Sequence, residues 1–277
     1  MDYKKVLTIQ DVSCVGQCSL TVALPILSAC GHETAILPSA VLSTHTGGFK
    51  DYTFRDLSDD IPAIQKHWQS EGIKFDAVYT GYLGSVKQIA MVEDIIKTML
   101  REGGVSVVDP AMGDNGKLYP GFDNEYAKAM IKLCSCADVI LPNITEACYM
   151  VDYPYLTEYD ESYVTELLEK LSALGAKSIV LTGVSYSPDT TGVVLYDNGV
   201  QHYYRHGKVS KIFHGTGDIY SSTFVGSLIK GKDKFEAVKI AADFTVACIQ
   251  NTIGDDKHWY GVKFEPALPK LIELLNN

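Results

Sequence analysis

The sequence lacks long hydrophobic stretches and has few positive charges. None of its apolar runs approaches the ~20 residues that a membrane-spanning helix needs, and the first ten residues, MDYKKVLTIQ, are no exception. Only 24 Lys and Arg residues stand against 34 Asp and Glu residues, which gives a formal net charge of −10. Nucleic-acid binders and anionic-membrane binders need a positive face, so this balance argues against both classes. We therefore expect a cytoplasmic protein without a membrane or nucleic-acid partner.

Metal-binding cysteine spacings are also missing. The seven cysteines are an odd number, and they are scattered from Cys14 to Cys248. Two close pairs, Cys14/Cys18 and Cys134/Cys136, lack the second pair that a zinc site requires. We expect buried free thiols in a reducing compartment. Internal repeats and low-complexity linkers are absent too, and residues 11–16 (DVSCVG) contain no G-x-G-x-x-G pattern, which argues against a dinucleotide oxidoreductase.

Short apolar runs rich in β-branched residues alternate with longer segments of helical period. This rhythm predicts βαβ units and a mostly parallel sheet with helices on both faces. We therefore interpret residues 1–277 as one α/β domain. Strands are expected at 6–9, 35–42, 77–79, 105–108, 139–141 and 179–181, and helices at 19–29, 58–70, 85–102, 123–136 and 158–174.

The pattern changes toward the C-terminus. Residues 192–196 and 200–204 flank the turn sequence Asp197-Asn198-Gly199 and predict a β-hairpin. Pro25, inside the first helical pattern, predicts a kink or an early stop. Polar or glycine residues follow each apolar run, and ligands of parallel sheets bind beyond the carboxyl ends of the strands, so functional residues are expected at that edge. Three further helices are expected near 217–230, 233–251 and 265–275.

The segment HGTGDIYSSTFVGSL, residues 214–228, has two glycines and an aspartate where a helix is expected to begin. The amides of Gly215, Thr216 and Gly217, at the positive end of the helix dipole, can hold an anionic oxygen. Asp218 could simply complement that dipole. If the amides hold a phosphoryl group, it could instead take a proton from an attacking hydroxyl. These residues alone leave both interpretations open.

This glycine turn resembles the anion-hole signature of the ribokinase-like superfamily, whose aspartate serves as catalytic base. DPAMGD (109–114) is similar to the DPVMGD segment of the vitamin-kinase branch, and PNITE (142–146) resembles the N-x-x-E motif tied to magnesium and phosphate. STHTGG (43–48) and GYLGS (81–85) resemble segments of the pyridoxal kinases, and the matches keep family order over roughly residues 4–250. The resemblance implies a ribokinase-like three-layer α/β/α fold with a central, mostly parallel β-sheet.

The resemblance also implies an activity, namely ATP-dependent phosphorylation of the 5′-hydroxymethyl group of pyridoxal, pyridoxine or pyridoxamine. Asp218 would be the catalytic base, and the amides of 215–217 would form the anion hole. The implied protein is a homodimer that uses Mg²⁺. Whether it also needs a monovalent cation such as K⁺ stays open.

The implied ATP-binding residues are Asp109, Asn143, Glu146 and Thr182. Asp109 and Glu146 would also support Mg²⁺, which prefers oxygen ligands and keeps several waters. The alternative is that Glu146 caps a helix and Asp109 merely precedes a proline turn. Thr182 stands where some relatives carry a lysine near the nucleotide, and its hydroxyl could meet a phosphate oxygen or the ribose.

For the acceptor, the resemblance implies a pyridine ring near the end of the first strand. Thr46 would make a polar contact and Tyr82 would pack on the ring, while His45 could contact the substrate hydroxyl or be a loop residue. Asp11 departs from the serine that many pyridoxal kinases have at this place. Either Ser13 replaces that serine, or Asp11 accepts a hydrogen bond from the pyridine hydroxyl or a substrate amine, which would favour pyridoxamine.

Three alternatives stay open. The cation-rich segment 205–211 (RHGKVSK) could cover the ATP phosphates or be an edge strand protected by lysines. The chain could be a hydroxymethylpyrimidine kinase of thiamine biosynthesis, although segments 45–48 and 82 favour the pyridine substrate. It could also be a non-catalytic nucleotide or vitamin binder, and the anion cradle with its carboxylates argues against that.

Overall fold

A nine-stranded β-sheet runs through the computed structural model, which describes residues 3–209 and 213–277. Its strands are β1 (Lys5–Ser13), β2 (Glu33–Leu42), β3 (Phe54–Asp56), β4 (Phe75–Thr80), β5 (Leu100–Val108), β8 (Val139–Ile140), β9 (Ser178–Ser187), β10 (Thr190–Asp197) and β11 (Val200–Gly207). They lie in the order β11-β10-β9-β8-β5-β4-β1-β2-β3. The neighbours from β2 to β9 pair in parallel, whereas β3, β10 and β11 are antiparallel additions at the two edges. The mostly parallel sheet and the predicted hairpin are thereby confirmed.

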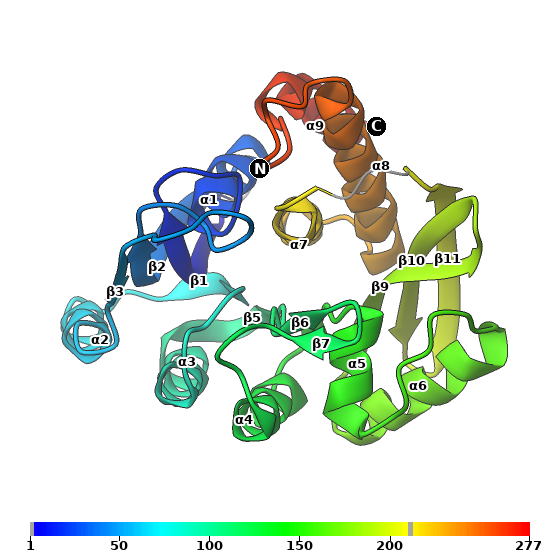
Figure 1. Ribbon diagram of the computed structural model, residues 1–277. Helices are drawn as coiled ribbons and strands as arrows, with labels where there is room; N and C mark the ends of the chain where they lie inside the picture. The colour runs from blue at the N-terminus through cyan, green and yellow to red at the C-terminus, as the bar shows by residue number, and fades with distance from the viewer. Residues whose placement is uncertain (1–2, 210–212) are drawn as a thin grey trace.

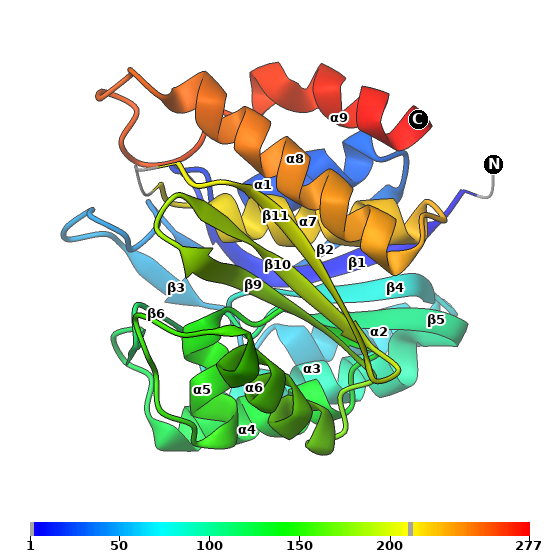
Figure 2. The same ribbon diagram turned by 90° about the vertical axis from the view of Figure 1, so that its right-hand side faces the viewer.

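Helices cover both faces of this sheet, as Figures 1 and 2 show, which confirms the predicted three-layer α/β/α fold. One face carries α1 (Leu20–Ala29), α7 (Thr216–Ile229), α8 (Lys234–Thr252) and α9 (Leu268–Asn276). The other carries α2 (Ile61–Ser70), α3 (Val86–Met99), α4 (Asn124–Ser135), α5 (Ile144–Val151) and α6 (Glu161–Ala173). A small hairpin, β6 (Gly113–Asp114) and β7 (Lys117–Leu118), and a 3₁₀ turn at Glu265–Ala267 complete the described elements.

The central strands are buried on both faces. In β4, Val78 packs into the core beneath α2–α6, while Ala77 and Tyr79 pack into the core beneath α1, α7 and α8. Successive side chains of a strand point to opposite faces, so a strand between two helical layers has to be apolar throughout. The short continuous apolar runs of the sequence therefore became the middle of the sheet.

Two local expectations were wrong. Helix α1 does not stop early at Pro25, because it continues to Ala29 and buries Val22, Ala23, Ile26 and Leu27, and a kink at Pro25 stays a prediction. Such burial sustains helices whose local propensity is poor. The helix expected at 85–102 ends at Met99, and the chain enters β5 directly at Leu100, whose backbone is extended.

The seven cysteines are all free, as expected. Their burial is only partly as expected, since Cys14 and Cys136 are exposed, Cys18 is half-buried and the other four are buried. Within residues 3–209 and 213–277, no helix combines the length and the apolar character needed to cross a membrane.

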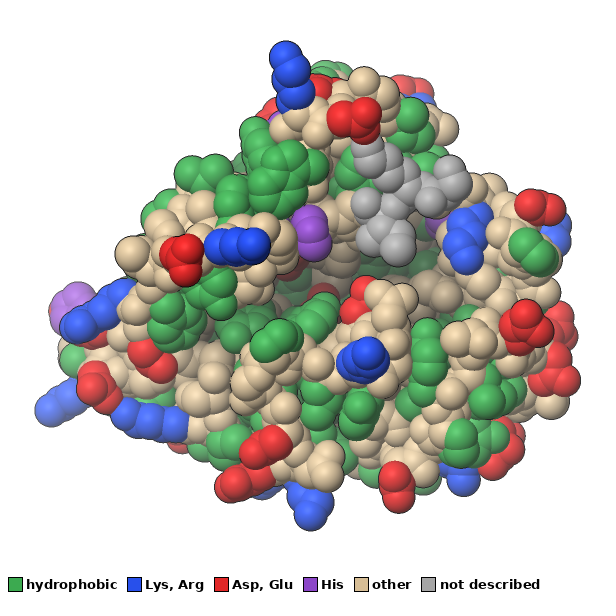
Figure 3. Space-filling model, in the orientation of Figure 1, with side chains coloured by type: hydrophobic (Ala, Val, Ile, Leu, Met, Phe, Trp, Pro, Cys, Tyr) green, Lys and Arg blue, Asp and Glu red, His purple; other side chains and the backbone are tan. Residues whose placement is uncertain are grey.

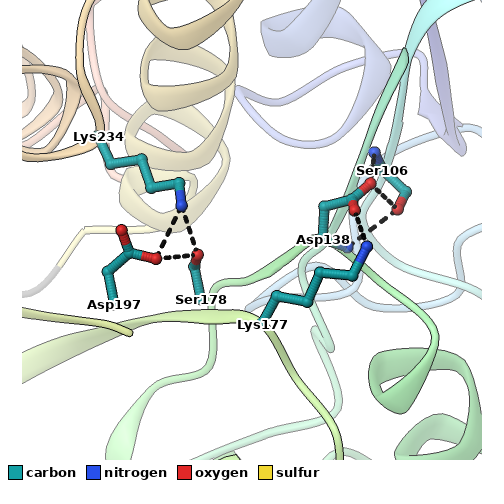
Figure 4. A network of polar contacts seen from close by, with 6 residues as sticks. All are labelled: Ser106, Asp138, Lys177, Ser178, Asp197 and Lys234. Carbon is teal, nitrogen blue, oxygen red and sulfur yellow. Dashed lines mark hydrogen bonds and ion pairs between the residues drawn. The ribbon is translucent and has the colours of Figure 1, made fainter. Parts of the chain in front are cut away.

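A polar network fastens the amino ends of β8 and β9 (Figure 4). Lys234, the first residue of α8, donates to Ser178 Oγ (2.8 Å) and to Asp197 Oδ1 (2.7 Å). Ser178 Oγ in turn donates to Asp197 Oδ1 (2.6 Å). Asp138, just before β8, accepts from the Ser106 amide (2.8 Å). These bonds tie α8 to the β9–β10 pair and β8 to β5.

Replacing Lys234 with methionine should lower the free energy of unfolding by about 1 kcal/mol, because Asp197 would keep its partly buried charge and lose a charged donor. Lys87→Met is the matched control, since Lys87 pairs with Asp59 on the open surface and should change stability by less than about 0.5 kcal/mol. Urea unfolding followed by circular dichroism measures both. Equal effects of the two variants would contradict an anchoring role for Lys234.

Candidate active site

The predicted acidic residues lie at the carboxyl ends of parallel strands and in the first turns of helices. Figure 3 shows a hollow between the two helical layers, with acidic side chains in and beside it and a histidine at its rim. Asp11 lies near the end of β1, where the pairing of β1 with β2 shifts register. Asp109 follows β5, and Asp218 lies in the first turn of α7. The charges of Asp109 and Asp11 both act on Asp218, so three distant segments of the chain meet here.

The glycine turn starts α7 in the way the anion cradle requires. Gly215 is the N-cap and has left-handed backbone angles (φ 80°, ψ 0°). A β-carbon at this position would overlap the carbonyl oxygen of Gln17. Gly217 is exposed, and nothing lies within 4 Å of the position its β-carbon would take. The first amides of a helix have no carbonyl one turn earlier, so those of Thr216 and Gly217 can receive an anionic oxygen.

Asp218 is half-buried beside this turn. Burial first, and then the negative charge of Asp109, raise the pKa of Asp218 to about 7. The nearby backbone amide of Ser19 works against that rise. A carboxyl group that titrates near neutral pH is matched to taking up a proton during a reaction.

Asp109 is fixed by its neighbours on both oxygens. Its Oδ2 accepts from Ser221 Oγ (2.7 Å), one turn after Asp218 on α7, and its Oδ1 accepts from the Ala111 amide (3.1 Å). Burial raises the pKa of Asp109 to about 6. The carboxylates of Asp109 and Asp218 therefore repel one another in a poorly solvated place, and a cation between phosphates and carboxylates would relieve this repulsion.

Glu146 acts as a helix cap in the structure. Its Oε2 accepts from the Asn143 amide (2.9 Å), while Asn143 Oδ1 accepts from the Glu146 amide (2.9 Å), which forms a capping box at the start of α5. Its Oε1 accepts from the amide of Met112 (2.9 Å), and Asn143 Nδ2 donates to the Gly113 carbonyl (2.8 Å). Burial and the Asp109 charge raise the pKa of Glu146. Both residues thus clamp the 109–114 segment onto α5, and their contacts with ATP stay predictions.

The donor set fits Mg²⁺ held largely through water and phosphate. Among the described residues no three His, Cys, Asp or Glu side chains converge as a metal ligand set. Asp109 and Glu146 are close enough for the Asp109 charge to raise the Glu146 pKa. Mg²⁺ commonly takes one or two carboxylates and completes its shell with water and substrate phosphates.

On the acceptor side, Asp11 is buried and is held by two hydroxyl groups. Ser13 Oγ donates to Asp11 Oδ2 (2.8 Å), and Ser19 Oγ donates to Asp11 Oδ1 (2.5 Å). Ser13 is therefore a support for Asp11 in this structure. Burial raises the pKa of Asp11, and the two serine hydroxyls oppose that rise.

His45 uses both ring nitrogens within the protein. Nδ1 accepts from the Gly47 amide (3.0 Å), so Nε2 carries the hydrogen and donates to the carbonyl of Tyr260 (2.6 Å). Burial lowers the pKa of His45, which keeps the ring neutral. A ring nitrogen could contact a substrate hydroxyl only by giving up one of these bonds.

The remaining predicted residues are Thr46 and Tyr82, which lie in loops, and Thr182, which lies within β9. Thr46 is exposed in the loop after β2, and half-buried Tyr82 stacks on Phe122 with ring centroids 5.4 Å apart. Thr182 Oγ1 donates to the carbonyl of Pro142 (3.4 Å), which joins β9 to the segment before α5. In the cation-rich segment, Arg205–Gly207 lie in the edge strand β11, whereas Ser210 and Lys211 fall outside the described residues.

Sequence reasoning missed Ser19, Ser221 and an aromatic rim formed by Phe49 and Trp259. Ser221 could have been found, because it lies three residues after Asp218 and so on the same face of α7. Nothing in the sequence marks Ser19. The rim joins loops that are far apart in the chain, since Phe49 packs on Trp259 with ring centroids 4.7 Å apart next to the His45–Tyr260 bond.

Two solved structures share this fold. A crystal structure of pyridoxal kinase from Lactobacillus plantarum is 32% identical, with a TM-score of 0.91, and the match covers 99% of this chain and 98% of that one. A Bacteroides thetaiotaomicron protein provisionally described as a phosphomethylpyrimidine kinase, in a crystal form with pyridoxal, is 37% identical, with a TM-score of 0.91 over 98% of this chain and 96% of that one. Fold and similarity together define a ribokinase-like kinase.

Sequence comparison narrows this class to a family. The pyridoxine kinase of Bacillus subtilis (strain 168) is 31% identical over 201 residues, which are 68% of this chain and 71% of that protein. The family model described as phosphomethylpyrimidine kinase matches residues 27–262. The chain belongs to this family of pyridoxal and phosphomethylpyrimidine kinases, the vitamin-kinase branch of the ribokinase-like superfamily, which confirms the resemblance seen in its motifs.

The two glycines of the turn should respond oppositely to alanine. Gly215→Ala should cost at least about 2 kcal/mol of stability, since a left-handed conformation strains a β-carbon and the Gln17 carbonyl has to move. Gly217→Ala should fold with unchanged or slightly higher stability, because space is open there and alanine favours the helix by roughly 0.5–1 kcal/mol. Urea unfolding of both variants measures the difference. Equal stabilities would show that the turn does not rest on Gln17.

Proposed function

We propose that this kinase transfers the γ-phosphoryl group of ATP to the 5′-hydroxymethyl group of a B6 vitamer, which is pyridoxal, pyridoxine or pyridoxamine. The observation that carries the proposal is Asp218, a carboxylate with a pKa of about 7 beside the glycine turn of α7. The similarity of the whole chain to the Bacillus subtilis pyridoxine kinase and to the Bacteroides protein crystallised with pyridoxal supports the choice of acceptor. ATP as donor, Mg²⁺, a homodimeric state and a cytoplasmic location belong to the same proposal.

In this mechanism Asp218 takes the proton of the acceptor hydroxyl as that oxygen bonds to the γ-phosphorus. The bond between the γ-phosphorus and the β,γ-bridging oxygen breaks, and ADP leaves with that electron pair. The amides of 215–217 stabilise the negative charge on the migrating phosphoryl group. Bound Mg²⁺ would neutralise phosphate charge. Asp109 and Glu146 would provide the carboxylates for that ion, and Asn143 and Thr182 would contact the nucleotide.

The acceptor would lie between the end of β1 and Tyr82. Tyr82 offers an aromatic face to a flat heteroaromatic ring, and Thr46 offers a hydroxyl from the loop that carries His45. Asp11 would accept a hydrogen bond from the pyridine hydroxyl or from a substrate amine, because Ser13 and Ser19 hold it in place without occupying all of its lone pairs. This carboxylate favours pyridoxamine among the three vitamers.

The second candidate is phosphorylation of hydroxymethylpyrimidine or its phosphate. It is favoured by the description of the family model and by the provisional description of the Bacteroides protein. Both candidate acceptors present a hydroxymethyl group on a six-membered, nitrogen-containing aromatic ring, so the same base and anion hole would serve either. The residues that face the ring, rather than those that face the phosphate, have to decide between them.

An ATP-consumption assay with the three B6 vitamers and hydroxymethylpyrimidine tests the acceptor. We expect turnover with the vitamers, highest kcat/KM with pyridoxamine, and weaker use of the pyrimidine. Asp11→Ser should abolish the preference for pyridoxamine. Preferred use of hydroxymethylpyrimidine would establish the second candidate, and absence of phosphorylation of every acceptor would indicate a non-catalytic binder.

Replacing Asp218 with asparagine should lower kcat by about 10²-fold or more, the range that general bases contribute, with little change in ATP binding. Asp243→Asn is the matched control, because Asp243, on α8, accepts a hydrogen bond from the Tyr204 hydroxyl of β11 (2.6 Å) and is not among the predicted site residues. Steady-state kinetics and nucleotide titration measure the two effects. Near-normal turnover of Asp218→Asn would refute its role as base.

Activity should fall as the pH is lowered through about 7. The pKa of Asp218 is raised to about 7, and its protonated form, which predominates below that pH, cannot accept the hydroxyl proton. A profile of kcat/KM against pH in a constant-ionic-strength buffer measures this limb. The limb should be missing from the residual activity of Asp218→Asn, and a wild-type profile that is flat across pH 7 would contradict the assignment.

A further inference from the structure

Ser19 has a backbone conformation that side chains rarely adopt. It is the N-cap of α1, with φ 55° and ψ −132°, and its side chain is buried. An N-cap serine normally caps its helix with its hydroxyl, yet this one makes no capping hydrogen bond. Strained backbone of this kind persists only where the surroundings hold it, and it concentrates at functional sites.

The contacts of Ser19 show what holds it and where it points. Its hydroxyl donates to Asp11 Oδ1 at 2.5 Å, the shorter of the two hydroxyl bonds to that carboxylate. Its backbone amide lies close enough to the carboxylate of Asp218 to oppose the rise of that pKa, in keeping with the close packing of the 17–19 turn on the 215–218 turn. Its carbonyl accepts from the amides of Val22 and Ala23 in the first turn of α1. One residue thus bridges the carboxylate beside the acceptor site and the carboxylate beside the glycine turn.

The direction of a backbone amide depends on the backbone angles around it. If residue 19 relaxed to an ordinary negative φ, its amide would turn away from Asp218. The neighbouring backbone cannot easily follow, because the Gln17 carbonyl is packed against Gly215. The hydroxyl bond to Asp11 is therefore the contact of the Ser19 side chain that opposes relaxation.

We propose that Ser19 is a positioning residue, whose hydroxyl bond to Asp11 maintains the strained backbone that directs its amide at Asp218. The proposal rests on the proposed function, because Asp218 is taken there as the base. It also connects the two halves of the site, since a ligand that pulls on Asp11 acts through Ser19 on the orientation of Asp218.

Alanine and glycine variants at position 19 separate the effect of the hydroxyl group from the effect of the backbone conformation. Both remove the bond to Asp11. Alanine retains a β-carbon and should relax, so kcat should fall between about tenfold and 10²-fold, the cost of a small misplacement of a reacting group, with little change in the KM for ATP. Glycine adopts positive φ without strain, so Ser19→Gly should retain most of the wild-type kcat.

Two further variants serve as references. Ser13→Ala removes the other hydroxyl bond to Asp11 and leaves the Ser19 amide in place, so it should raise the KM for the acceptor more than it lowers kcat. Ser28→Ala removes an exposed serine of the same helix, whose hydroxyl donates to Thr34 Oγ1 (3.2 Å), and should behave as wild type.

Steady-state kinetics decides between outcomes. Loss of kcat in Ser19→Ala with recovery in Ser19→Gly supports the proposal. Equal kcat in both variants, whether normal or reduced, would overturn it. Inactivity of the wild-type protein toward every acceptor would instead refute the proposed function. In that case crystal structures still test Ser19, because an alanine variant with unchanged φ at residue 19 and an unmoved Asp218 carboxylate would overturn its positioning role.

Discussion

The contact between two backbone turns organises the functional end of this protein. The turn before α1 and the turn before α7 pack so closely that residue 215 has no room for a β-carbon beside the Gln17 carbonyl. Both helices consequently begin at the same place, and helix N-termini favour negative charge. The Ser19 amide of one turn lies close to Asp218 and opposes the rise of its pKa, and the other turn carries the amides of the proposed anion cradle. A cradle for an anion and a carboxylate could coexist here because the backbone would supply the donors.

A second consequence concerns how the protein keeps its acidic groups together. Asp11, Asp109, Glu146 and Asp218 are brought to one edge of the sheet, and burial raises the pKa of each. Serine hydroxyls and backbone amides stabilise these groups through short, directed bonds. Neutral donors hold a carboxylate in position without cancelling its charge. The charge therefore stays available, and in the proposed mechanism it would serve a cation that arrives with ATP and the proton of the acceptor.

On the proposed acceptor side, loops from distant parts of the chain pack against one another and fix one another's side chains. Gly16 and Gly48 let the rings of His45 and Trp259 lie against backbone, and the Tyr260 carbonyl settles which His45 nitrogen carries the hydrogen. The proposed ring-facing wall is thus assembled from loops, whereas the proposed phosphate-facing wall is assembled from helix starts. Differences in acceptor among members of this family can then arise in the loops while the phosphate side stays unchanged.

The amino-acid sequence by itself determined the alternation of strands and helices, the C-terminal hairpin and the glycine turn with Asp218, because each depends on side-chain periodicity or on turn chemistry within a few residues. Tertiary structure decided that α1 runs through Pro25, that Glu146 accepts from the Met112 amide, and that Ser19 and Ser221 hold the acidic groups. The Ser221–Asp109 bond joins residues 112 positions apart, and the His45–Tyr260 bond spans 215 positions. Such bonds leave no local pattern, because only the folded sheet brings their partners within reach.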